Sequence, residues 1–212
     1  MNKVDLTLYL VTNSDGRGES DFLCIIADAC AGGVTLVQLR EKEKSGKDYY
    51  ELALKVKPVT DRYGVPLIID DRADVAMASG AAGVHLGQTD LPVAAARAML
   101  GEGMLIGASA KTVEQALAAE AAGADYLGIG AIYPTTTKVI TTITAVETLN
   151  DIAKAVKIPV VAIGGLNRDN LSILYGSGAS GAAVVTAIMN SEAPYAAASD
   201  LRRLIDENIR SR

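Results

Sequence analysis

The chain has 212 residues, half of them apolar, with a formal net charge of −5 and a pI near 5.0. That length suits one domain with a sizeable core, and the acidic balance argues against general affinity for nucleic acid or an anionic membrane. The first residues are acidic and polar where a signal peptide is apolar, and no apolar run is long enough to span a membrane, so a cytoplasmic protein is expected.

Short apolar runs recur along the chain and predict β-strands. They lie at residues 6–12, 35–40, 66–70, 83–87, 105–109, 126–130, 159–165 and 182–186. Most are continuously apolar rather than alternating, which is typical of parallel strands covered on both faces. Alanine-rich stretches with apolar residues every three or four positions lie between them and predict helices.

The junctions between helices and strands share a glycine-containing pattern, as in "ASGAAGVHL" and "AEAAGADYL". Glycine favours these places because it adopts the left-handed conformation that ends a helix. Eight strand–helix units without a linker predict an α/β fold, a (β/α)₈ TIM barrel forming a single domain over residues 1–212. A doubly wound open sheet is the alternative, but "VTNSDGRGES", after the first strand, lacks the glycine-rich phosphate loop usual in that fold.

The two cysteines, Cys24 and Cys30, fall on one expected helix. Their separation of six is not a spacing at which helical side chains meet, so no disulfide is expected between them. Without a CxxC pattern, both are interpreted as small buried apolar residues.

Polar residues follow the second predicted strand, at the end where barrel enzymes carry their chemistry. Gln38, Arg40 and Lys42 occupy alternate positions in "QLREK", which directs their side chains to one face, toward the barrel mouth. An anion site is favoured there over a solvent-exposed run of mixed charges.

Carboxylates follow the next two strands. Asp70 and Asp71 end the third, and Asp90 lies shortly after the fourth, so all three should converge at one rim beside the cations. Mg²⁺ is commonly held by one or two carboxylates together with substrate phosphates, so a magnesium site is expected here. The alternative is that Asp71 or Asp90 caps the helix that follows it.

The later loops are polar and glycine-rich. Ser109 ends the fifth strand, and "YPTTTK" at residues 133–138 offers hydroxyls and an ammonium group for a carboxylate or phosphate. Gly164 and Gly165 after the seventh strand let the backbone approach a ligand, and the eighth strand opens a short helical stretch. These last two loops form the recurrent phosphate site of phosphate-binding barrels.

Several of these motifs together resemble the thiamine phosphate synthase family. They are "QLREK", "GVHLGQTD", "GASAKT", "YPTTTK", "VVAIGGL" and "VVTAI", in family order and spacing along nearly the whole chain. The resemblance implies the same barrel and a transferase that joins hydroxymethylpyrimidine diphosphate to a (carboxylated) thiazole phosphate, releasing pyrophosphate. It also implies a dissociative, Mg²⁺-assisted mechanism, in which no side chain serves as a nucleophile.

The resemblance assigns roles to residues of this chain. The catalytic residues would be Lys138, Ser109 and Arg40, and Mg²⁺ would be bound by Asp71 and Asp90. The pyrimidine diphosphate would contact Gln38, Leu39, Arg40, Glu41, Lys42, Asp70, Ser109 and Lys138. The thiazole phosphate would contact Thr135, Thr136, Thr137, Gly165, Val185 and Thr186. His85, within the fourth strand, is interpreted equally as a packed, hydrogen-bonded residue or as a catalytic one.

The chain departs from the family pattern at Asp70, where the family usually has Asn. An ionised Asp only accepts hydrogen bonds, so Asp70 is expected to be protonated, turned toward the metal or paired with a basic neighbour. A thiazole tautomerase-like paralogue and a noncatalytic phosphate-ligand sensor are the alternative functions. The first usually has a His where this chain has Lys111, and the second could dispense with the metal carboxylates.

Overall fold

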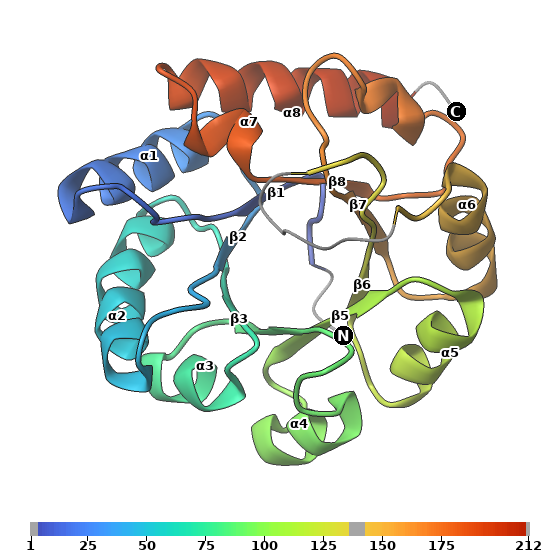
Figure 1. Cartoon of the computed structure of the whole chain (residues 1–212), viewed down its shortest axis with the longest axis horizontal. Helices are drawn as coiled ribbons and strands as arrows, with labels where there is room; N and C mark the ends of the chain where they lie inside the picture. Colours follow the sequence, from blue (N-terminus) through green and yellow to red (C-terminus); the bar gives the residue numbers. More distant parts are fainter. Residues whose placement is uncertain (1–3, 136–142, 211–212) are drawn as a thin grey trace.

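The computed structural model describes residues 4–135 and 143–210, and these form a closed barrel of parallel strands ringed by helices (Figure 1). The strands pair in sequence order, and β8 closes onto β1. They are β1 Leu8–Val11, β2 Leu36–Leu39, β3 Leu67–Asp70, β4 Gly83–Leu86, β5 Leu105–Ala110, β6 Tyr126–Ile129, β7 Val160–Ile163 and β8 Gly181–Val184. Each predicted strand overlaps one of these, and the predicted barrel is confirmed.

Helices follow the strands around the outside of the barrel. They are α1 Glu19–Ala31, α2 Gly46–Arg62, α3 Ala73–Ser79, α4 Val93–Leu100, α5 Val113–Ala121, α6 Val146–Ala155, the 3₁₀ helix η1 Leu171–Leu174, α7 Thr186–Met189 and α8 Pro194–Arg210. Gly80 ends α3 at φ +68, in the left-handed conformation expected of these junctions.

The connection from β7 to β8 differs from the pattern of regular α-helices. It carries only the short η1, preceded by a turn in which Asn170 Oδ1 accepts from the Asn167 backbone N–H at 2.9 Å. Asparagine side chains that bond to nearby backbone favour turns over helix, which explains the difference.

The core has two parts. One lies between the strands and the helices, and the other fills the barrel interior. The interior set comprises Leu6, Tyr9, Val11, Leu36, Ile68, Tyr126, Val161 and Ala183. Because the interior is packed with side chains, a ligand of such a barrel is bound at its mouth rather than within a pore.

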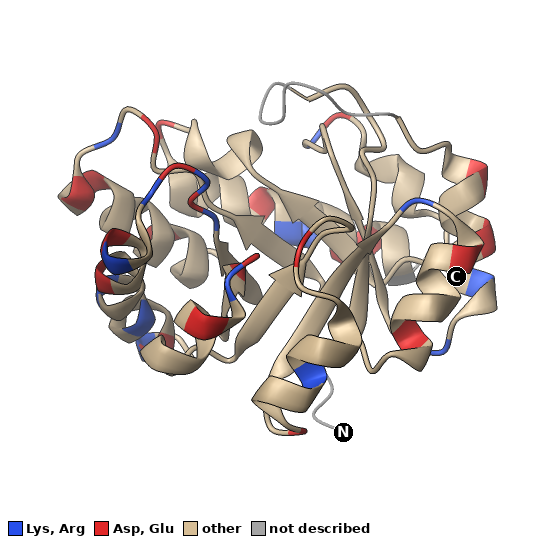
Figure 2. Cartoon of the chain, turned by 60° about the horizontal axis from the view of Figure 1, so that its bottom comes forward, with Lys and Arg blue, Asp and Glu red and all other residues tan. Residues whose placement is uncertain are grey.

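The described surface carries positive and negative residues intermixed over the outer helices (Figure 2). No helix in the described ranges is long and apolar enough to cross a membrane. Cys24 and Cys30 are both free, as predicted. Burial is confirmed for Cys30, where it raises the thiol pKa to about 12, but Cys24 is exposed, so the prediction of burial was wrong there.

Candidate active site

The ends of β2 and β3 bring cations and carboxylates into direct contact. The Lys42 ammonium lies 2.8 Å from Asp70 Oδ2 and forms a second ion pair with Asp71. Arg40 Nε is 3.8 Å from the same Asp70 oxygen. Gln38, Arg40 and Lys42 follow one another at alternate positions as the pattern predicted. The positive charges of Arg40 and Lys42 meet the carboxylates of the neighbouring strand.

Asp70 is the most buried of these carboxylates, with a side chain only 9% exposed. Burial raises its pKa, against the opposing effect of Lys42 and Arg40. Its Oδ2 is held by charge alone, without an aligned hydrogen bond. Asp70 was expected to be protonated, turned toward the metal or paired with a basic neighbour. The structure shows the pairing, with Lys42 and Arg40.

Asp71 has an unusual backbone conformation, with φ +62, and among the described residues it is the only non-glycine with positive φ. Its N–H donates to His85 O at 2.8 Å, a bond to β4 that holds the turn in place. Asp and Asn tolerate this left-handed region better than most residues. The turn directs the Asp71 carboxylate toward Lys42 and Asp90.

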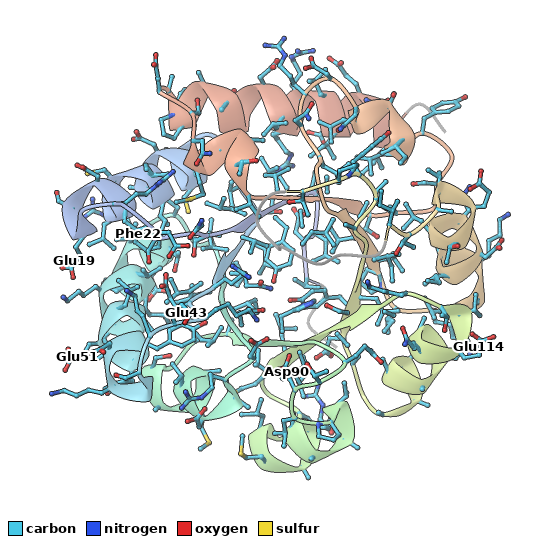
Figure 3. The ribbon with its side chains drawn as sticks, in the orientation of Figure 1. Glu19, Phe22, Glu43, Glu51, Asp90 and Glu114 are labelled. Carbon is cyan, nitrogen blue, oxygen red and sulfur yellow. The ribbon has the colours of Figure 1, made fainter. Side chains whose placement is uncertain are left out.

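Asp90 reaches the same rim from the β4–α4 loop, where it points toward the barrel mouth (Figure 3). Its Oδ2 accepts from Gly87 N–H at 2.7 Å, which fixes the loop. Burial raises the Asp90 pKa, and the adjacent Asp71 carboxylate raises it further. Glu19, Glu51 and Glu114, in contrast, lie at the periphery of the same view.

The alternative role of Asp71 and Asp90 as helix caps was wrong. The helix α3 begins after Arg72 and α4 begins after Pro92, and neither has a side-chain cap hydrogen bond. Both carboxylates face the rim and each other instead, where Asp71 pairs with the cation Lys42 and Asp90 accepts from Gly87 N–H.

The residues present fit a divalent cation whose coordination is completed by substrate. Within the described ranges, no three Asp, Glu, His or Cys side chains are grouped to hold a metal by themselves. Asp71 and Asp90 supply two adjacent carboxylates. Burial, and then the neighbouring Asp71, raise the pKa of Asp90, and a bound cation would favour the ionised form of both groups. Two carboxylates plus phosphate oxygens are a common magnesium environment.

A chain of hydrogen bonds crosses the barrel interior beneath this rim. Gln38 Nε2 donates to the Tyr9 hydroxyl at 2.7 Å, and that hydroxyl lies 2.8 Å from the Tyr126 hydroxyl. The Tyr126 hydroxyl is 3.3 Å from His85 Nδ1, and His85 Nε2 is 3.0 Å from Ser109 Oγ. The network therefore links two predicted site residues, Gln38 and Ser109, through three buried side chains.

Sequence reasoning missed Tyr9 and Tyr126, although a tyrosine within an apolar strand is itself a signal, because a buried hydroxyl requires a partner. For His85, the packed, hydrogen-bonded interpretation is confirmed. Burial, and then the charge of Lys42, lower its pKa to about 4, so the ring is neutral at physiological pH.

The low pKa of His85 predicts how stability depends on pH. In the unfolded chain, His85 binds a proton below about pH 6.5, whereas in the folded chain it does so only below about pH 4. Stability therefore falls as the pH falls from about 6.5 to about 4. The chain has only one histidine. We expect urea unfolding at steps from pH 7 to 5 to show a shallower loss of stability in His85→Asn than in the wild type. Equal slopes would contradict the assigned shift.

Two other predicted contacts of the diphosphate lie off the rim. The Leu39 side chain is fully buried in the core between strands and helices. The Glu41 side chain, 5% exposed, accepts from Ser14 Oγ at 2.8 Å and leaves its Oε1 without a partner. The side chains of Leu39 and Glu41 are therefore buried away from the rim. Any contact of these two residues with the diphosphate would have to come from their backbone.

The predicted thiazole phosphate residues divide between described and undescribed parts of the chain. Thr136 and Thr137 lie outside the described residues, as does Lys138, which is predicted to contact the diphosphate. Gly165 has φ +66, and a Cβ there would lie 2.6 Å from Pro134 O, so its glycine is required by the neighbouring β6–α6 loop. That packing places Thr135, next to Pro134, in the loop over the end of β7. Val185 and Thr186 directly follow β8, where α7 begins.

Comparisons with known proteins agree with this geometry. The family model of thiamine monophosphate synthase matches residues 8–188. The chain is 53% identical over 192 residues to thiamine-phosphate synthase 2 of Streptococcus pneumoniae serotype 4, covering 91% of each chain. It is 49% identical over 207 residues to thiamine-phosphate synthase of Enterococcus faecalis, covering 98% of each.

Solved structures give the same result. The thiamine phosphate pyrophosphorylase of Pyrococcus furiosus superposes with a TM-score of 0.88 at 37% identity, covering 97% of this chain and 98% of that one. A 3-hexulose-6-phosphate synthase superposes with a TM-score of 0.74 at 17% identity, a likeness of fold alone.

Proposed function

The chain belongs to the thiamine monophosphate synthase family, and we propose that it joins hydroxymethylpyrimidine diphosphate to a thiazole phosphate, forming thiamine phosphate and pyrophosphate. The observation that carries this proposal is the cluster at the ends of β2, β3 and β4. There, Arg40 and Lys42 lie against Asp70, while Asp71 and Asp90 adjoin each other. Such a cluster suits a diphosphate accompanied by a divalent cation.

In the proposed reaction, the bond from the pyrimidine methylene carbon to the diphosphate oxygen breaks first, and the thiazole nitrogen then captures the resulting cation. Arg40 and Lys42, joined by Lys138, bind the departing diphosphate and stabilise the charge that develops on it. Asp71 and Asp90 would hold Mg²⁺, which, when bound, would neutralise part of that charge. Lys42 exchanges its carboxylate partners for diphosphate oxygens when the substrate binds.

The interior network supports the binding of a heteroaromatic ring at the barrel mouth. Gln38 and Ser109 carry both donors and acceptors, and their partners Tyr9 and His85 hold them in fixed orientations. Such groups are suited to an aminopyrimidine, which itself has donors and acceptors. Neutral His85 is a hydrogen-bonding group in this proposal, and the reaction has no step that requires it to accept a proton.

The thiazole phosphate is assigned to the opposite side of the mouth. Its phosphate would be bound by backbone N–H groups after β7 and β8, near Gly165, Val185 and Thr186, and its ring by Thr135, Thr136 and Thr137. The position of these loops at the end of the barrel, as in other phosphate-binding barrels, supports the assignment.

The assay that tests the proposal combines the purified protein, both substrates and Mg²⁺, and measures pyrophosphate and thiamine phosphate together. Equimolar formation of the two products is expected, with loss of activity when EDTA removes the metal. If neither product forms in the presence of the metal, the proposal is wrong. A phosphate-ligand sensor would bind the substrates without converting them.

We expect Asp70→Asn to keep turnover unchanged or to raise it up to a few-fold. The substitution removes a buried charge that holds Lys42 at 2.8 Å, and an amide can donate a hydrogen bond to the diphosphate. Steady-state turnover at saturating substrates measures the effect. A large loss would identify Asp70 as a metal ligand.

A further inference from the structure

Tyr49 lies in α2, outside the residues assigned to substrate or metal, and its hydroxyl reaches the ends of two strands of the site. We propose that Tyr49 is a positioning residue, which holds the end of β2 against the end of β3 and so sets the spacing between the cations and the carboxylates of the rim. The inference rests on the proposed function, since it concerns the same diphosphate and metal site.

The contacts of the hydroxyl are specific. It donates to Leu39 O at 2.5 Å and accepts from Asp70 N–H at 3.1 Å. Leu39 and Asp70 are the last residues of β2 and β3, and the paired register of these strands ends at Leu39 opposite Ile69. One oxygen atom therefore joins the two backbones at the last point before their chains separate into loops.

The next residues along the two chains are those that carry the chemistry. Arg40 follows Leu39 directly, and Asp71 follows Asp70. Lys42 crosses between the two loops to pair with both carboxylates. A displacement at the strand ends therefore changes the separation of the groups that would share the diphosphate and the metal.

Tyr49 is well anchored for this task. Ser45 caps α2, accepting from Asp48 N–H, and Tyr49 lies one turn into the helix, with its own N–H donating to Ser45 O at 2.9 Å. The side chain is 1% exposed. Burial raises the pKa of its hydroxyl, which keeps the proton that is donated to Leu39 O.

The ring and the hydroxyl have separable effects. The ring packs in the core between strands and helices, and Phe would fill the same space. Tyr49→Phe thus removes the link between the strand ends while keeping the packing. Residues that orient metal-binding groups without touching the metal typically contribute 10–100-fold to metal affinity or activity.

The test compares Tyr49→Phe with Thr60→Val, which removes a different buried hydroxyl from the far end of the same helix, where Thr60 donates to Lys57 O. We expect Tyr49→Phe to lower turnover about tenfold and to raise about tenfold the Mg²⁺ concentration for half-maximal rate. The KM for the thiazole phosphate should stay unchanged. Thr60→Val should change neither the Mg²⁺ requirement nor either KM, whatever it does to thermal stability.

A second measurement does not require turnover. Calorimetric titration with inorganic pyrophosphate in the presence of Mg²⁺ should show about tenfold weaker binding in Tyr49→Phe than in the wild type. If the wild type binds magnesium pyrophosphate but makes no thiamine phosphate, the proposed function fails, and this titration still decides the role of Tyr49. An unchanged Mg²⁺ requirement and unchanged pyrophosphate affinity would overturn the inference. So would a wild type that does not bind magnesium pyrophosphate.

Discussion

Asp71→Asn is expected to lower turnover by about a hundredfold or more, because it removes a carboxylate that would bind the metal beside the departing diphosphate. Asparagine is the informative replacement, since it keeps the size of the side chain and tolerates φ +62 at this position. Raising the Mg²⁺ concentration should restore part of the rate. Steady-state kinetics over a range of Mg²⁺ concentrations measures both effects.

Two further variants separate chemistry from backbone strain. Asp71→Ala should show the same loss of turnover together with a loss of about 1 kcal/mol in stability, because alanine is disfavoured in the left-handed region. Asp74→Asn, an acid-to-amide change at the exposed start of α3, should leave turnover unchanged. If Asp71→Asn retains full turnover, Asp71 is not a metal ligand.

Arg97→Ala is expected to lower the free energy of unfolding by roughly 2–4 kcal/mol without changing turnover. The Arg97 guanidinium donates to Gly101 O and Met104 O, each at 2.7 Å, to Gly123 O at 2.9 Å and to Asp125 Oδ2 at 2.6 Å. The Arg97 side chain is only 13% exposed, so its removal leaves the half-buried Asp125 carboxylate without its cation and several carbonyl groups without their donor.

The location of this cluster explains why activity should survive. Gly101 and Met104 lie in the segment that leads into β5, and Gly123 and Asp125 lie just before β6, at the opposite end of the strands from the rim. Asp125 Oδ2 also accepts from Ile106 N–H at 2.8 Å, so the cluster joins two neighbouring strand entries. Urea unfolding and a turnover assay on the same preparation test both parts of the prediction.

The matched control is Arg203→Ala. Arg203 also pairs with acidic side chains, Asp200 and Glu207, but on the exposed surface of α8. Exposed pairs of this kind contribute little to stability, because water and salt screen them. An equal loss of stability in the two variants would contradict the importance assigned to the buried cluster.

The barrel could be predicted from the sequence because each of its units is local. An apolar run of five to seven residues, a glycine junction and an alanine-rich helix are all short patterns, and their repetition along the chain predicts the closed parallel barrel that the structure has. The same rule predicted that chemistry follows the strands. From their positions after the second, third and fourth strands, it placed Arg40, Lys42, Asp71 and Asp90 at one rim of the barrel.

The tertiary structure alone decided how those residues pair. The position of Asp70 beside Lys42, the left-handed turn at Asp71 and the lack of a side-chain cap at the starts of α3 and α4 depend on contacts between separate strands and loops. The hydrogen-bonded chain from Gln38 to Ser109 likewise joins residues far apart in the sequence. Periodicity and spacing describe one segment of the chain at a time, so they do not specify which side chains from separate segments come into contact.

What the sequence determined by itself was the barrel, the end of the barrel that carries the site and the family of the chain, because each depends on short-range patterns and motifs. What only the tertiary structure decided was the arrangement within the site, including the hydroxyl of Tyr49 between the ends of β2 and β3. Pairing of buried polar groups is set by distance and direction in space, so it emerged only when the strands were brought together.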